Sequence, residues 1–194
     1  MKIGIIPTIR EPYSLQYEFS IDQNLLKFFR KAFPSSDFIF LTEKKKYNID
    51  LLCISGGNDI NTTNGKNKLR KSLDVFFYKI YKRINIPIIG ICHGAQFIFK
   101  NEGGHLINSN KHVGRRHNVI YLDKLSNRKN FKKNSFHTYV ISKLNSKFEA
   151  FAWSNDNFIE GFESKKNKTL CFMWHPEREE KFHSLDIFKV QNLI

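Results

Sequence analysis

The chain has no apolar stretch long enough to cross a membrane as a helix. None of its runs approaches the roughly 18 consecutive apolar residues that a spanning helix needs. Its first residues, MKIGIIPTIR, contain neither the long apolar segment nor the small-residue cleavage site of a secretory signal. We therefore expect a cytoplasmic protein that does not bind membranes.

Cysteine, glycine and proline are also scarce. The 194 residues include 3 Cys, 10 Gly and 5 Pro, and no linker rich in Gly, Ser or Pro interrupts the sequence. Cys53 and Cys171 lie inside the apolar runs LLCIS and LCFMW, which favours reduced thiols that act as small core residues. These features predict a single domain over residues 1–194, long enough to bury a core.

Acidic residues are few compared with basic ones. Eighteen Asp and Glu face 32 Lys and Arg, so the formal net charge is +14. Such a charge indicates either an anionic partner or a lysine-rich solvated surface. The basic clusters EKKKY, KHVGRRH, NRKNFKKN and ESKKNK are interrupted by Asn and Ser more than by aromatic residues. This spacing is not typical of a base-stacking platform, so we expect no specific nucleic-acid partner.

The first half of the chain alternates short apolar runs with helical patterns. Strands are expected at 2–7, 37–41, 50–55 and 87–92, and helices at 20–33 and 68–84. The second half contains several short strand-like runs and a final helical segment from residue 184. This order predicts an α/β fold with a mostly parallel central sheet flanked by helices. Residues 8–19 are expected to form either a lid over a binding site or a plain surface loop.

The stretch IIGICHGAQFIF, residues 88–99, places Cys92 at the tip of a buried strand, directly before a helix. Ligands of open α/β sheets bind at the carboxyl ends of the strands. A residue on a sharp strand-to-helix turn projects there, and the positive end of the following helix stabilises a thiolate. The backbone N–H of His93 is free to bind an oxyanion. Cys92 is therefore predicted to be a nucleophile rather than a structural cysteine.

Two further stretches supply the groups that such a nucleophile needs. In FMWHPEREE, His175 ends a strand and Glu177 follows two residues later, close enough to orient the imidazole. In CISGGND, two glycines follow a strand, and Gly57 is placed to offer a second oxyanion N–H. Each motif alone is weak, but together they predict cysteine-dependent acyl transfer.

In this order the motifs resemble the class I glutamine amidotransferase superfamily, and most of all its γ-glutamyl hydrolase branch, the peptidase family that includes γ-glutamyl-γ-aminobutyrate hydrolase. The matching stretches are SGG at 55–57, GICHGAQ at 90–96, NSFH at 134–137, EGF at 160–162 and WHPE at 174–177. The resemblance spans nearly the whole chain and implies a flavodoxin-like arrangement of the sheet. It implies no metal and no cofactor.

The resemblance also implies roles for individual residues. Cys92 would attack the γ-carbonyl of a glutamyl amide, His175 would activate the thiol and protonate the leaving amine, and Glu177 would orient His175. The N–H groups of Gly57 and His93 would form the oxyanion hole. The glutamyl group would be held by Gly56, Gln96 and the stretch Asn134, Ser135, Phe136 and His137. Water would then hydrolyse the thioester and release L-glutamate.

Three departures from the family pattern stand out. The Arg-Asp-x-x-Glu motif of the branch reads RKSLD here, with Arg70 kept, Lys71 in place of the acid and Asp74 in place of Glu. The chain is shorter than is usual in the branch. His93 follows the nucleophile directly, as in the related protease and deglycase superfamily, where that histidine belongs to the triad. The C-terminal WHPE motif favours His175 as the base instead.

The basic charge favours a substrate with an anionic leaving group. One such substrate in the branch is γ-glutamyl-CDP-amidate, whose hydrolysis releases cytidine diphosphoramidate for capsule phosphoramidate synthesis. Candidate contacts with its pyrophosphate are Arg10, Arg70, Lys71, Arg115 and Arg116. The alternatives are a glutaminase subunit that supplies ammonia to a separate synthetase, a hydrolase of another γ-glutamyl amine such as γ-glutamyl-γ-aminobutyrate, and a basic nucleic-acid-binding or regulatory protein that keeps an inactive amidotransferase fold. The sequence does not determine the oligomeric state.

Overall fold

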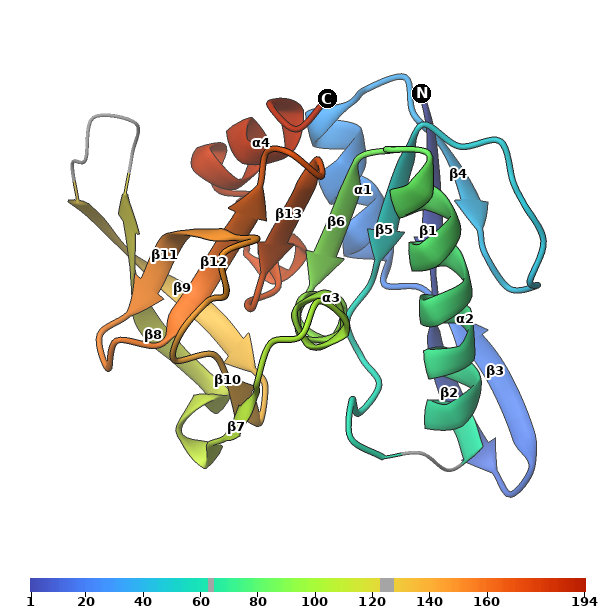
Figure 1. Cartoon of the computed structure of the whole chain (residues 1–194), viewed down its shortest axis with the longest axis horizontal. Coiled ribbons are helices and arrows are strands. Elements are labelled where there is room, and N and C mark those ends of the chain that lie inside the picture. The colour runs from blue at the N-terminus through green and yellow to red at the C-terminus, as the bar shows by residue number, and fades with distance from the viewer. Residues whose placement is uncertain (63–64, 123–127) are drawn as a thin grey trace.

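The computed structural model describes residues 1–62, 65–122 and 128–194. A mixed sheet runs through the whole molecule in the order β4-β1-β5-β6-β13-β12-β11-β8-β9 (Figure 1). Its strands are β1 (Lys2–Ile6), β4 (Asp37–Phe40), β5 (Leu51–Ile54), β6 (Ile88–Ile91), β8 (Val113–Leu122), β9 (Arg128–Phe136), β11 (Glu149–Ser154), β12 (Ile159–Ser164) and β13 (Thr169–Phe172).

The core of this sheet is parallel. The strands from β4 to β13 pair in parallel, and every residue of β5, β6 and β13 is buried. Continuous apolar runs form such strands because helices cover both of their faces. From β13 onward, β12, β11, β8 and β9 add antiparallel pairs. The expected α/β fold is confirmed, with the parallel strands at its centre and an antiparallel extension built from the second half of the chain.

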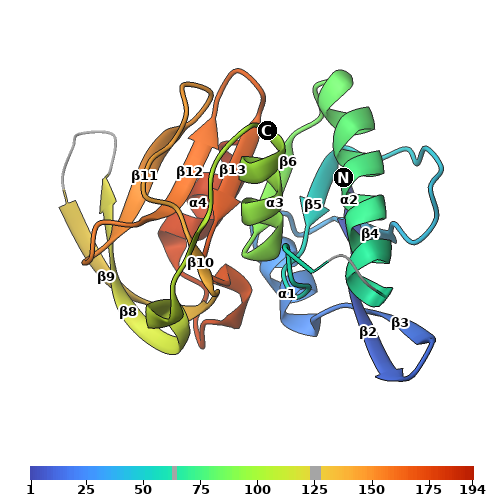
Figure 2. The same ribbon diagram turned by 60° about the horizontal axis from the view of Figure 1, so that its bottom comes forward.

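Helices cover the two faces of the parallel strands. Figure 2 shows α2 (Gly65–Arg83) and α3 (His93–Asn101) on one face, and α1 (Gln23–Ala32) and α4 (Ser184–Gln191) on the other. Asp22 caps α1 by accepting a 2.9 Å hydrogen bond from the N–H of Asn24. Cys53 and Cys171 are fully buried in the middle of β5 and β13, as predicted.

Residues 8–19, left open by the sequence, form most of a β-hairpin at one edge of the fold. Its strands are β2 (Thr8–Tyr13) and β3 (Gln16–Ser20), and its tip exposes Tyr13 and Leu15. A second short pair, β7 (Ile107–Asn108) with β10 (Tyr139–Val140), and the 3-10 turns η1 (Asn110–His112) and η2 (Pro176–Arg178) complete the elements. Within the described part of the chain, the helices are too short or too polar to span a bilayer.

Candidate active site

The sheet order brings the three sequence motifs to one edge. β6 lies between β5 and β13, so Cys92, which follows β6, has the glycine loop on one side and His175 on the other. The N–H of Cys92 donates to the carbonyl oxygen of Phe172 over 2.7 Å, which continues the β6–β13 pairing up to Cys92. The three motifs therefore meet where an open α/β sheet binds its ligands.

Cys92 occupies a sharp turn between β6 and α3. Its backbone has φ 50° and ψ −102°, a conformation that a residue with a side chain rarely adopts. The turn is tight because α3 packs directly against β5: a Cβ on Gly94 would lie 2.0 Å from the carbonyl oxygen of Ile54. Strain of this kind is typical of functional turns and presents the thiol at the end of the sheet.

His175 is held by Glu177. Its Nδ1 lies 2.6 Å from Glu177 Oε1, and both side chains are 3% exposed. Burial alone would lower the pKa of His175, but the adjacent carboxylate of Glu177 and the Cys92 thiolate raise it well above its ordinary value. Because Nδ1 contacts Glu177, Nε2 is the ring nitrogen left to interact with Cys92.

The pKa of the Cys92 thiol depends on burial and on His175. Burial raises the pKa of a cysteine, but the charge of His175 and its hydrogen bond to the sulfur lower the pKa of Cys92 below its ordinary value. By contrast, burial raises the pKa of Cys53 and Cys171. A low-pKa thiol, an imidazole and a carboxylate in contact can carry out nucleophilic acyl transfer.

The glycine loop after β5 closes the site on the side opposite β13. The ring of His175 rests against Gly56, where a Cβ would lie 2.4 Å from its Cε1. Gly57 has φ +122°, in a region that disfavours residues with side chains, and packs against Thr8. Thr8 Oγ1 donates to the carbonyl oxygen of Gly56 over 2.7 Å, so the β2–β3 hairpin supports this loop.

The side chain of His93 contacts Asn58 and Asp74 rather than Cys92. Its Nδ1 lies 2.7 Å from the carbonyl oxygen of Asn58 and its Nε2 lies 2.7 Å from Asp74 Oδ2, with 3% of the side chain exposed. Neither ring nitrogen is left to activate Cys92, which argues against His93 as the triad base. Its backbone N–H, by contrast, begins α3, where the first N–H groups have no partner inside the helix.

Arg70, expected from the sequence to contact the pyrophosphate, lies inside the fold. It is fully buried, and its Nε donates to Asp74 Oδ1 over 2.8 Å. Its terminal nitrogens donate to the carbonyl oxygens of Pro7 and Ser55 over 2.9 and 2.6 Å. Because the guanidinium donates these hydrogen bonds, Arg70 links α2 to the ends of β1 and β5. Asp74, which also binds His93, joins α3 to the same network.

Asn134 positions the histidine rather than reaching outward. Its Oδ1 accepts from the His175 N–H over 3.0 Å, and its Nδ2 donates to the His175 carbonyl oxygen over 2.7 Å. The same Nδ2 donates to Glu179, which forms a 2.6 Å ion pair with Arg116. The sequence analysis expected the Asn134 side chain to hold the glutamyl group; in the structure its polar atoms bond to His175 and Glu179. Arg116, half exposed, is the outer end of this chain of contacts.

The rest of the NSFH stretch lies beside the same histidine. The Ser135 hydroxyl is fully buried and donates to the carbonyl oxygen of His112, so it is directed into the fold. Phe136 is half exposed, with its ring centroid 5.8 Å from that of His175. His137 is buried and interacts electrostatically with Cys92. Phe136 and His137 thus line the site, whereas Ser135 supports it.

The remaining residues that the sequence predicts to contact substrate lie on separate elements. Gln96 is buried in the first turn of α3, after Cys92. Arg10 lies exposed on β2, next to Ile9, whose N–H donates to Asn58 beyond the glycine loop. Arg115 is exposed on β8, in register with Ser135. Lys71 lines a lysine-rich surface hollow on α2, among residues that include none of the triad.

Sequence reasoning missed how two groups support the triad. Asp74 stands out in the sequence only as a replacement for Glu, yet its position four residues after Arg70 is the spacing of a helical ion pair, a signal that was available. The hydrogen bonds between Asn134 and His175 could not be predicted from sequence spacing. They join β9 to the segment after β13, and the two residues are far apart in the sequence.

Comparison with known proteins agrees with this geometry. The family model described as "Glutamine amidotransferase class-I" matches residues 14–192. The γ-glutamyl-CDP-amidate hydrolase of Campylobacter jejuni is 32% identical over 147 residues, which cover 74% of this chain and 70% of that protein. Anthranilate synthase component 2 of Cyanophora paradoxa is 30% identical over 153 residues, covering 73% and 74%.

The fold is also found among solved structures. A protein from Thermoplasma acidophilum, described as a GMP synthase subunit, superposes with a TM-score of 0.73 at 20% identity, over 100% of this chain and 93% of that one. A glutamine amidotransferase from Thermotoga maritima gives a TM-score of 0.67 at 15% identity, over 91% and 76%.

Proposed function

Because this chain belongs to the class I glutamine amidotransferase family, we propose that it hydrolyses a γ-glutamyl amide through a triad of Cys92, His175 and Glu177. The family assignment makes it a cysteine-dependent C–N hydrolase of γ-glutamyl amides. The residues that act and the amine that leaves are the proposal. The observation that carries it is the convergence of Cys92, His175 and Glu177 at the carboxyl ends of β6 and β13, with His175 Nδ1 2.6 Å from Glu177 Oε1.

In the first step, the Cys92 thiolate attacks the γ-carbonyl carbon and forms a carbon–sulfur bond. The carbonyl π electrons move onto oxygen, and the backbone N–H groups of Gly57 and His93 stabilise this oxyanion. The carbon–nitrogen bond then breaks, and the leaving nitrogen takes the proton from His175 Nε2. Glu177 stabilises the imidazolium before the transfer and fixes the tautomer after it.

In the second step, water hydrolyses the γ-glutamyl thioester. His175, now neutral at Nε2, accepts a proton from the water as its oxygen attacks the carbonyl carbon. The carbon–sulfur bond breaks, Cys92 leaves as a thiolate, and L-glutamate is released. The enzyme returns to its starting state of thiolate and imidazolium. The lowered pKa of Cys92 and the raised pKa of His175 favour this state at neutral pH.

We propose γ-glutamyl-CDP-amidate as the substrate, with cytidine diphosphoramidate as the product. Two facts support this choice: the formal net charge of +14, and 32% identity to a relative named for this activity. Of the basic residues considered, Arg10 and Arg115 suit pyrophosphate contact best. Both are exposed, and they lie on segments that flank the triad, one beside the glycine loop and the other opposite Ser135.

A side-by-side hydrolysis assay tests this function. Glutamine, γ-glutamyl-γ-aminobutyrate and γ-glutamyl-CDP-amidate are compared by kcat/KM, with Cys92→Ala and His175→Ala as controls. We expect the nucleotide amidate to exceed the others by orders of magnitude, and both variants to be inactive. A preference for a small neutral amide would refute γ-glutamyl-CDP-amidate as the substrate but would not contradict the proposed triad. Full activity in His175→Ala would overturn the triad.

A second candidate is a glutaminase that supplies ammonia to a separate synthetase. It is favoured by the 30% identity to anthranilate synthase component 2, which is named as one component of a synthase. This function predicts weak glutaminase activity in the isolated chain and strong activity when a partner protein is added. A high kcat/KM on the nucleotide amidate without any partner would contradict it.

A further inference from the structure

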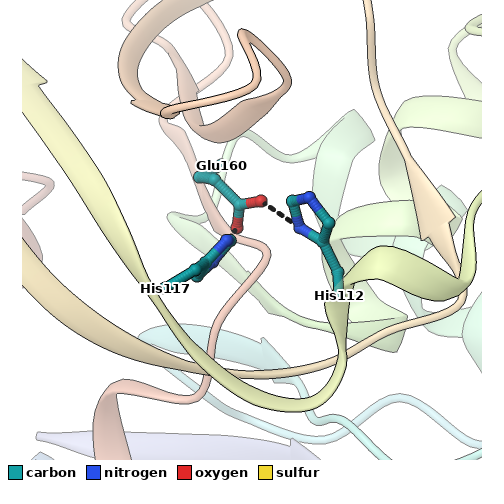
Figure 3. A group of neighbouring side chains, drawn as sticks. All are labelled: His112, His117 and Glu160. Carbon is teal, nitrogen blue, oxygen red and sulfur yellow. Dashed lines mark ion pairs between the residues drawn. The ribbon is translucent and has the colours of Figure 1, made fainter.

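Three histidines surround one buried glutamate next to the proposed catalytic centre. His112 comes from η1, His117 from β8, His137 from the turn after β9 and Glu160 from β12. Figure 3 shows the rings of His112 and His117 directed at the Glu160 carboxylate. Glu160 is fully buried, and His112 and His137 are each 2% exposed. From the motifs that contain these residues, the sequence predicts substrate contacts and basic loops, and it predicts no metal.

Outer contacts decide which ring nitrogens carry protons. His112 Nε2 lies 3.1 Å from the carboxylate of Asp156, which in turn accepts a 2.5 Å hydrogen bond from the Ser154 hydroxyl. His137 Nδ1 lies 2.9 Å from the carbonyl oxygen of Tyr139. Both outer nitrogens face acceptors and must donate. In a neutral ring, the inner nitrogens therefore present lone pairs.

These two inner nitrogens and Nε2 of His117 lie at ion-pair distances from Glu160 but lack hydrogen-bond geometry. His112 Nδ1 lies 3.0 Å from Oε1, while His137 Nε2 and His117 Nε2 lie 3.4 and 3.7 Å from Oε2. All five of these atoms are buried and lack a hydrogen-bond partner. Buried polar atoms are seldom left unpaired, because burial removes the hydrogen bonds that water would otherwise make to them.

Positive charge is needed between these atoms, and it comes either from protonated rings, as in the ion pair of His112 with Glu160, or from a bound cation. Protonating all three rings would place three cations around Glu160, with ring centroids of His112 only 4.5 and 5.1 Å from those of His117 and His137. A divalent ion supplies the charge with every ring neutral. The outer Asp156 and Tyr139 contacts are the kind that orient histidine ligands of metals.

We propose that His112 Nδ1, His117 Nε2 and a carboxylate oxygen of Glu160 bind a Zn²⁺ ion, with His137 bordering the fourth position. The three ligand atoms lie within 4.8 Å of one another. Ligand atoms around tetrahedral zinc are separated by roughly 3.3 Å, so modest closure of the cluster forms the site. Two histidines and one glutamate are a ligand set that zinc accepts. The ion ties η1 and β8 to β12, and it does not depend on which amide the enzyme cleaves.

Metal content and cobalt substitution test this site. Because the Cys92–His175 pair could itself bind zinc, measurements are made on both the wild type and Cys92→Ala. We expect about one zinc per chain in both proteins, a tetrahedral Co²⁺ absorption spectrum after exchange, and a lower thermal midpoint after chelation that zinc restores. Loss of all metal in Cys92→Ala would place the ion at the nucleophile and overturn the site.

Ligand variants locate the ion. His117→Asn removes a partly exposed ligand, and His105→Asn, at an exposed histidine outside the cluster, is the matched control. We expect loss of stoichiometric zinc in the first and none in the second, and about 10–100-fold weaker binding in Asp156→Asn. Equal zinc binding in His117→Asn and the control would refute the site. If a variant fails to fold, the wild-type Co²⁺ spectrum decides: octahedral or absent Co²⁺ bands overturn the proposal.

Discussion

Replacing Glu177 by Gln probes the electrostatics of the triad. The substitution keeps the size of the side chain, and its amide oxygen can still accept from His175 Nδ1, which now lies 2.6 Å from the carboxylate. What is lost is one negative charge. Glu177 raises the pKa of His175, so in Glu177→Gln that pKa falls and the imidazolium that protonates the leaving amine is less stable.

The size of this effect follows from the geometry. Two unit charges about 4 Å apart interact by about 4 kcal/mol at an effective dielectric constant of 20, which sets an upper limit. Because each 1.4 kcal/mol is a factor of ten and the hydrogen bond survives, we expect kcat/KM to fall by about 10²- to 10³-fold. A pKa raised in the wild type keeps His175 charged to high pH. The alkaline limb of the pH profile should therefore move to lower pH in the variant.

The assay is glutamate release measured across the pH range for wild type, Glu177→Gln and Glu180→Gln. Glu180, three residues further and exposed, is the control, and its profile should match that of the wild type. If Glu177→Gln kept the wild-type kcat/KM and the wild-type alkaline limb, Glu177 would not stabilise the charged form of His175, and the electrostatic account would be wrong.

Three further predictions concern the groups around the triad. Asp74→Ala leaves Arg70 and His93 without their shared buried partner, so urea denaturation should show a loss of roughly 3–5 kcal/mol; an unchanged midpoint would contradict the network. Asn134→Ala should lower kcat with little change in KM, because Asn134 holds the backbone of His175; a rise in KM alone would restore it as a substrate ligand. Iodoacetamide at neutral pH should alkylate Cys92 and spare the buried Cys53 and Cys171, as read by mass spectrometry; modification of all three at similar rates would refute the lowered pKa.

Much of the site was predictable because its motifs are local. A strand that ends in Cys-His-Gly and one that ends in His-Pro-Glu each signal a turn whose shape depends on neighbouring residues alone. Cys92 does lie on a strained turn after β6, and Glu177 does reach His175, as the two-residue spacing predicted. The parallel half of the fold was predictable for a similar reason, because continuous apolar runs mark strands buried on both faces.

Roles that depend on distant partners were not predictable. Arg70 was expected to contact phosphate, but the tight packing of α2 against β1 and β5 buries it beside Asp74. Asn134 was expected to face the substrate, but β9 places it under the backbone of His175. In both cases the sequence shows the residue type but not the direction of its side chain, because direction depends on which elements pack together.

The sequence by itself determined the local pattern on which the proposed chemistry depends: a cysteine at a strand-to-helix turn, a histidine and a glutamate two residues apart, and two glycines after a strand. The tertiary structure decided the assembly. It inserted β13 beside β6, which brings His175 to Cys92, and it gathered His112, His117, His137 and Glu160 from separate elements around one buried point. The physical reason is that turn geometry and apolar periodicity depend on adjacent residues. Strand order and side-chain convergence depend instead on how the whole chain buries its apolar surface.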